Sequence, residues 1–170
     1  MASGGSKSAA FILLILNLGL YSIVTIIAAW AANHGIERSH ETASVLSIPA
    51  RIFPIYFPFG NMATGFFVIF SLLAGVVGIG TSLTGLSNVL LWNVPNLNAA
   101  AASSFITWSL TLLAMGLAST EIAIGYTDSN LRTLEIMTII VSATQLFCTG
   151  AIHVGAEDAT RQLNQLMGRV

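Results

Sequence analysis

The stretch that decides the fold is residues 60–84, which read GNMATGFFVIFSLLAGVVGIGTSLT. It contains no charged side chain, and Asp, Glu, Lys, Arg and His are absent from the whole segment between Ile52 and Thr120. A helix needs about 20 mostly apolar residues to cross the hydrocarbon core of a bilayer. Charged residues make up 8% of the chain and apolar residues 55%, whereas a soluble domain carries about 25% charged residues. We therefore expect an integral membrane protein.

Three further apolar windows are long enough to span a membrane. Together with the first stretch, the predicted spans are 9–31, 60–84, 99–120 and 132–155. Each span should be an α-helix, because lipid offers no hydrogen-bond partner to a free backbone amide. The sequence thus predicts an all-α fold with one transmembrane domain over 1–155, built as a four-helix bundle, and a short polar tail over 156–170.

The orientation in the membrane follows from the number of spans and from the basic residues. Four spans place both termini on the same side, and we expect that side to be the cytoplasm. The first apolar run is longer than the ~7–15 residues of a signal-peptide core, so we expect it to remain as a span. The cations do not decide the orientation, because they are tied three to three: Lys7, Arg161 and Arg169 on the terminal side, and Arg38, Arg51 and Arg132 on the other.

Bulk composition excludes several classes of function. The net charge is −1, so the chain offers no basic surface to a nucleic acid. The single cysteine, Cys148, cannot form an internal disulfide. We find no phosphate-binding loop, nucleophile motif or histidine pair for haem, so we expect neither an enzyme nor a cofactor. His34, Glu37, His40 and Glu41 lack a metal-binding pattern and are expected in a solvated loop without a metal.

The connection before the second span is unusually apolar. From Ile48 it reads IPARIFPIYFPFGNM, and its three prolines prevent a continuous helix. We expect this segment at the membrane interface, where it is an anchor, a lid over a ligand path, or a surface that docks a partner. Arg51 within it either extends to lipid headgroups or provides a cation for a ligand.

Small residues form a stripe along the second span, at Ser71, Gly75, Gly78, Ser82 and Gly85. Their spacing of 4, 3, 4 and 3 residues puts all five on one helix face. Small side chains let two backbones approach closely, which is a main source of helix association in lipid. We therefore interpret the stripe as a packing surface, whose partner is either another helix of this chain or a second copy in a homo-oligomer.

Polar residues recur at helical spacing on the other three spans. Gln145 lies near the middle of the fourth span, where its amide would be costly if it faced lipid. We therefore predict that the three polar faces converge inside the bundle. They either hold the helices together, at ~0.6 kcal/mol per hydrogen bond, or line a path for a polar solute. The residues are Asn17, Tyr21 and Thr25; Ser104, Thr107, Thr111, Ala114, Ala118 and Glu121; and Glu135, Thr138, Ser142, Gln145, Thr149 and His153.

Charged residues also cluster where the fourth span begins, at Asp128, Arg132 and Glu135. Arg132 and Glu135 are three residues apart on a helix, so they are neighbours on its surface. Two interpretations are open. The pair neutralises itself, or the guanidinium is available to bind a carboxylate with its fork of donors.

Two long strings resemble a known family. They are SIPARIFPIYFPFGNMATGFFVIFSLLAGVVG at 47–78 and TDSNLRTLEIMTIIVSATQLFCTGAIHVG at 127–155, supported by MASGGSKSAAF at the start and HGIERSHETAS at 34–44. These strings are similar to the plant AWPM-like family, named after abscisic-acid-induced wheat plasma membrane polypeptide. The resemblance implies a plant plasma-membrane protein with four spans, induced by abscisic acid in drought, cold and seed maturation. It also implies abscisic acid influx, which is described for at least one member.

On this resemblance the expected ligand is abscisic acid or a similar small weak acid, an apolar ring system with one carboxylate. We expect Arg132 to hold the carboxylate, Glu135 and His153 to be proton partners, Gln145 to lie on the path, and Tyr56 to cover the ring. The alternative is a protein that transports nothing and stabilises or scaffolds the bilayer in the stress response. A continuous polar cavity beside Gln145 favours transport, and a dry, closely packed interior favours the scaffold.

Overall fold

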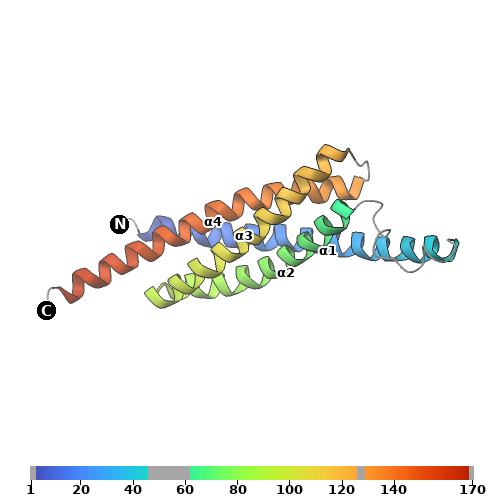
Figure 1. Ribbon diagram of the computed structural model, residues 1–170. Helices are drawn as coiled ribbons and strands as arrows, with labels where there is room; N and C mark the ends of the chain where they lie inside the picture. The colour runs from blue at the N-terminus through green and yellow to red at the C-terminus, as the bar shows by residue number, and fades with distance from the viewer. Residues whose placement is uncertain (1–2, 46–61, 126–128, 169–170) are drawn as a thin grey trace.

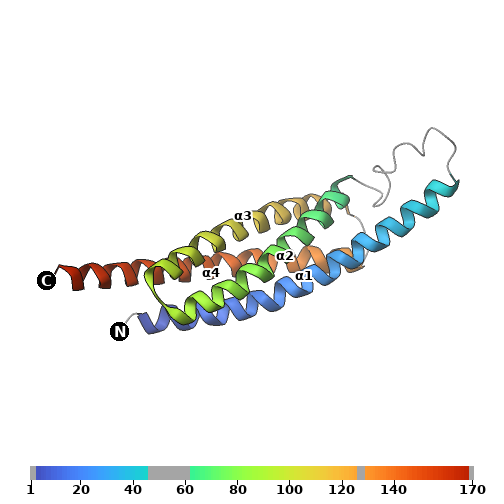
Figure 2. The same cartoon turned by 90° about the horizontal axis from the view of Figure 1, so that it is seen from below.

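The computed structural model describes residues 3–45, 62–125 and 129–168. These residues form four helices, α1 (Ser3–Val45), α2 (Met62–Leu91), α3 (Val94–Ile124) and α4 (Ser129–Met167), and contain no strand. The helices lie side by side as an elongated bundle, and the two ends of the chain lie at the same end of it (Figures 1 and 2). Each of α1 and α3 packs against both α2 and α4.

The distribution of side chains is that of a membrane protein. All four helices are long and apolar enough to cross a bilayer. Large apolar side chains point outward, as at Ile26, Ile106 and Phe147, while hydroxyl and amide groups are buried. This pattern is the reverse of a soluble bundle and is stable only where the surroundings are lipid. The prediction of an all-α, four-helix membrane bundle is therefore confirmed.

Two helices are much longer than a membrane is thick. At ~1.5 Å per residue, the 43 residues of α1 and the 39 residues of α4 extend over about 65 and 58 Å, against ~30 Å for the hydrocarbon core. The C-terminal part of α1 projects from one end of the bundle, and the C-terminal part of α4 projects from the other (Figure 2). The segment expected as a polar tail from residue 156 therefore continues α4 as helix to Met167.

The expectation of a solvated loop around His34 and Glu37 is wrong, because α1 is helical to Val45. His34 stacks on Trp30 at 5.3 Å between ring centroids, and Glu37 accepts a hydrogen bond from Asn33 at 3.1 Å. Hydropathy detects only the part of a helix that lies in lipid. No proline interrupts the chain here before Pro49, so the helix continues into the aqueous phase.

The connection between α2 and α3 is also shorter than the expected 85–98, since only Trp92 and Asn93 separate the helices. Asn93 caps α3 by accepting a hydrogen bond from the backbone N–H of Asn96 at 3.0 Å, and proline occupies the first turn. At the other end of α3, Gly125 has φ 75° and its N–H bonds back to the carbonyls of the last turn. The short, capped connection explains why α2 and α3 are antiparallel neighbours.

The small-residue stripe of α2 packs on α1 of the same chain. All five of its residues are buried. A side-chain carbon added at Gly75 would collide with Thr25, and one added at Gly78 would collide with the ring of Tyr21. At Gly85 the added carbon would lie 2.9 Å from Leu14 Cδ2. The sequence left open whether this face packs on another helix of the chain or on a second copy. In the structure it packs on another helix of the chain.

Candidate functional site

The polar faces of α1, α3 and α4 meet in the middle of the bundle around Gln145. The Nδ2 of Asn17 donates to Oε1 of Gln145 at 2.8 Å, and Nε2 of Gln145 donates to Oγ of Ser104 at 3.0 Å. The hydroxyls of Ser104 and Thr149 share a hydrogen bond at 2.7 Å. Gln145 is 3% exposed. The predicted convergence of the polar faces is confirmed, and both ends of the Gln145 amide are engaged.

A second group of hydroxyls lies beside this network and joins α1, α2 and α3. The phenol of Tyr21 and the hydroxyl of Thr111 are 2.8 Å apart, and Thr111 donates to the backbone carbonyl of Thr107. Tyr21 is therefore the donor of the bond to Thr111. The hydroxyl of Thr107 lies 3.0 Å from that of Thr81 on α2. Polar contacts thus continue across the bundle from α1 to α2.

Two carboxylic acids are buried where α3 ends and α4 begins. Glu121 on α3 is fully buried, and its Oε1 accepts a hydrogen bond from the hydroxyl of Thr64 on α2 at 2.7 Å. Glu135 on α4 is 4% exposed, and Arg132 precedes it by three residues on the same helix. Glu121 was placed on the polar stripe but not among the candidate site residues. The signal that could have selected it is that this carboxylic acid continues the helical spacing of the polar stripe on α3.

Three buried polar atoms have no hydrogen-bond partner within the described part of the chain: Asn17 Oδ1, Ser71 Oγ and Glu121 Oε2. Nearly all buried polar groups in proteins are satisfied, so each exception needs an explanation such as a water, an ion or a function. One exception lies in the central network and one on a carboxylic acid. The polar interior therefore combines saturated groups with a few that are open to another partner.

The remaining charged candidates lie outside this interior. Arg132 is exposed on the first turns of α4, and among the described residues it forms no ion pair with Glu135. Of the two open interpretations, mutual neutralisation is therefore not supported by an ion pair between Arg132 and Glu135 among the described residues. Arg51 and Tyr56 lie outside the described residues, together with the proline-rich connection up to residue 61. Asp128 lies outside them as well.

His153 lies at the end of the bundle where both termini are found. Its Nδ1 is 2.9 Å from the backbone carbonyl of Thr149, whose side chain belongs to the central network. His153 lines a groove of about 540 Å³ between α3 and α4. The other lining residues are Asn98, Ala101 and Ala102 from α3, and Ala156, Glu157, Thr160 and Arg161 from α4.

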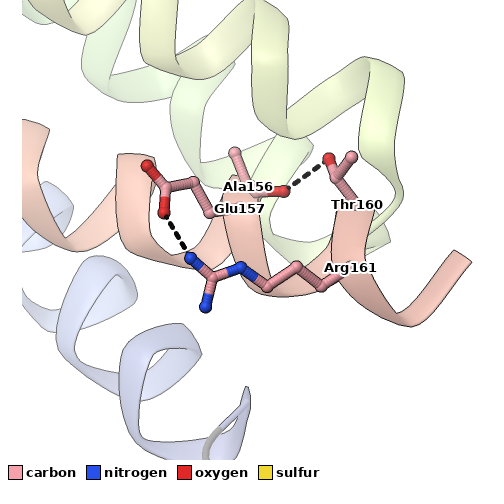
Figure 3. A network of polar contacts seen from close by, with 4 residues as sticks. All are labelled: Ala156, Glu157, Thr160 and Arg161. Atoms are coloured by element: carbon pink, nitrogen blue, oxygen red, sulfur yellow. Dashed lines mark hydrogen bonds and ion pairs between the residues drawn. The ribbon is translucent and has the colours of Figure 1, made fainter. Parts of the chain in front are cut away.

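On the α4 side of this groove, the polar side chains contact other residues of the same helix. Figure 3 shows Arg161 folded back onto Glu157, with their charged atoms 3.3 Å apart, and Thr160 bonded to the backbone carbonyl of Ala156 at 2.8 Å. Both members of the ion pair remain largely exposed, so the pair contributes little to stability. The groove thus combines alanine methyl groups with a guanidinium paired to a carboxylate, an imidazole, a hydroxyl and an amide.

Comparison with known proteins gives two matches. A model of the AWPM-19-like family matches residues 15–155. The rice protein "Membrane protein PM19L" (Oryza sativa subsp. japonica) is 41% identical over 144 residues, which cover 84% of this chain and 76% of that protein. No solved structure matches the chain.

Proposed function

Since the chain belongs to the AWPM-19-like family of membrane proteins, we propose that it is a plant plasma-membrane carrier that moves abscisic acid, or a similar small weak acid, into the cell. As a separate part of the proposal, we place both termini in the cytoplasm. The carrier needs no second copy for its packing, because the small-residue face of α2 is already covered by α1.

The observation that carries the proposal is the groove between α3 and α4. Its volume of about 540 Å³ falls within the ~300–1,000 Å³ range of small-molecule sites. Alanine methyl groups suit an apolar ring, Asn98 suits a carboxylate, and a bound carboxylate would displace Glu157 from Arg161. His153 lies one helical turn after Thr149, whose side chain belongs to the polar interior. Arg132, exposed at the opposite end of the bundle, is the proposed cation for the acid on that side.

A route through the bundle requires α3 and α4 to separate around Gln145. The bonds that join them there are those of the Gln145 amide and of the Thr149 hydroxyl to the hydroxyl and the carbonyl of Ser104. Four such bonds at ~0.6 kcal/mol each cost about 2 kcal/mol. This reduces the population of an open state by about 30-fold, which a carrier can accommodate. The hydrogen bonds of the interior therefore lower the population of the open state without excluding it.

The second candidate is a protein that stabilises or scaffolds the bilayer in the stress response. It is favoured by the packing of Gln145, whose amide is bonded at both ends and almost fully buried. In that case the polar faces serve only to hold the helices together. The two candidates differ in whether a solute crosses the membrane.

Uptake of radiolabelled abscisic acid by proteoliposomes tests the proposal. We expect saturable uptake that exceeds the passive rate of protein-free vesicles when the outside is more acidic. Arg132→Ala should abolish the saturable part while leaving folding intact, because Arg132 is exposed. Thr133→Ala is the matched control, since its hydroxyl is exposed and donates, among the described residues, to the backbone carbonyl of Ser129. Equal uptake with and without protein favours the scaffold, and unchanged uptake by Arg132→Ala removes this residue from the mechanism.

A further inference from the structure

We propose that the groove between the start of α1 and the end of α2 binds one anionic phospholipid, whose phosphate lies on Lys7. The first turns of α1 and the last turn of α2 lie together at the end of the bundle where the termini are found (Figure 2). The site needs only the membrane-spanning fold and does not depend on transport.

Lys7 provides a cation that no acid neutralises. Its Nζ donates to the backbone carbonyl of Leu90 at 3.2 Å and lies 5.5 Å from the centre of the Trp92 ring. A carbonyl at the end of a helix and an aromatic face both attract an ammonium group, but neither carries a full negative charge. Among the described residues, no carboxylate forms an ion pair with Lys7. Since an ammonium group has three donors, Lys7 can hold an anion while it keeps both contacts.

The acidic residues at this end of the bundle do not compete for Lys7. The α2 segment Met62–Leu91 contains no titratable side chain, and the first turns of α1 and α3 contain no acidic residue. On α4, Glu157 pairs with Arg161, and Asp158 forms no ion pair with Lys7. The positive charge is therefore available to a ligand from outside the chain.

Trp92 has a strained backbone that contacts on two sides hold in place. With φ 46°, it is the one residue other than glycine with a positive φ in the described part of the chain. Its ring lies under the Lys7 ammonium on one side and against Gly155 of α4 on the other, where an added carbon would be 2.8 Å from Cη2. Such strain persists only where surrounding contacts fix it, and it gathers at binding sites. Trp92 thus holds the ammonium of Lys7 in one place beside the groove.

The groove has walls that suit a hydrocarbon chain. Its volume is about 350 Å³, and it is lined by Lys7, Ser8, Phe11, Ile12 and Leu90. Ile12 and Leu90 are 64% and 61% exposed, so acyl chains cover them in a bilayer. A ligand that fills the groove must therefore combine an anionic head with an apolar chain.

A phospholipid with a net negative charge has this chemistry. Lysine and tryptophan are typical anchors at the headgroup level of a bilayer, which puts the groove where lipid phosphates are and not in open water. The phosphate is then held by the Lys7 ammonium and the Ser8 hydroxyl, and the upper part of one chain lies along Phe11 and Ile12.

Quenching of tryptophan fluorescence by brominated lipids tests the site, because bromine on an acyl chain quenches a tryptophan only at close range. Trp30→Phe with Trp108→Phe leaves Trp92 as the one tryptophan of the full chain. This protein is reconstituted in phosphatidylcholine vesicles that contain equal mole fractions of either brominated phosphatidylglycerol or brominated phosphatidylcholine. We expect the anionic lipid to quench Trp92 as if its local concentration were about fivefold higher.

Lys7→Gln in the same background should remove this preference, and Lys7→Arg should retain it. Arg38→Gln is the matched control, because it removes one positive charge from the projecting end of α1 and leaves Lys7 in place. Each intensity is divided by that in unbrominated lipid, so that changes in the emission of Trp92 itself cancel. Equal quenching of the unaltered site by the two lipids overturns the proposal, even where Lys7→Gln does not fold. A preference that persists in Lys7→Gln, or that Arg38→Gln also removes, overturns it as well.

Discussion

Gln145 joins three helices with one side chain, since it accepts from Asn17 of α1 and donates to Ser104 of α3. A glutamine amide in the middle of a bilayer is costly unless each of its polar atoms is bonded. The structure meets this condition through residues that lie 128 and 41 positions away in the chain. The residue therefore specifies how the helices are arranged as well as contributing to their stability.

Gln145→Leu should lower the free energy of unfolding by about 1–2 kcal/mol, because it removes two or three interhelical bonds worth ~0.6 kcal/mol each. Unfolding in mixed micelles, followed by circular dichroism, measures the change. The control is Gln162→Leu, since Gln162 is exposed on the projecting end of α4. An unfolding curve for Gln145→Leu that overlays the wild type would mean that the network contributes nothing to stability.

At the scale of helices, the close contact between α1 and α2 depends on glycines, which have no side chain to hold the helices apart. Gly78→Ala should destabilise the bundle by about 1–3 kcal/mol, the usual cost of overpacking, because the added methyl collides with the ring of Tyr21. Gly80→Ala is the matched control on the same helix, since nothing lies within 4 Å of its added carbon. Thermal unfolding in detergent measures both variants, and equal stability of the two would contradict the close contact.

The same helices show what a sequence reveals in advance. The spans can be predicted from composition, and the small and polar stripes from helical periodicity. This works because lipid requires every spanning segment to be a helix. The residue that packs on Gly78 cannot be predicted from helical periodicity, since a face of small residues can accept any neighbouring helix. Glu121 could not be selected from the sequence, because the burial of its carboxyl depends on a contact with Thr64, which lies 57 positions away in the chain. The ends of α1 and α4 were missed because helices continue beyond the lipid.

On the scale of the whole molecule, the two proposed functions differ in whether α3 has to move away from α4. The pair Ser104 and Thr149 offers a way to lock that contact, because their hydroxyl oxygens are 2.7 Å apart. Because the two side chains already meet, we expect cysteines at both positions to form a disulfide across the helices. The native Cys148 is free, buried and adjacent in the chain, so the experiment starts from Cys148→Ala.

In that background, Ser104→Cys with Thr149→Cys should take up abscisic acid when reduced and lose saturable uptake when oxidised, with recovery on renewed reduction. The lock replaces bonds that together cost about 2 kcal/mol to open with a covalent link that does not open at all. Each single cysteine variant is the control and should be insensitive to oxidant. If the oxidised protein transports as fast as the reduced one, the solute does not pass between α3 and α4. The route would then lie on another face of the bundle.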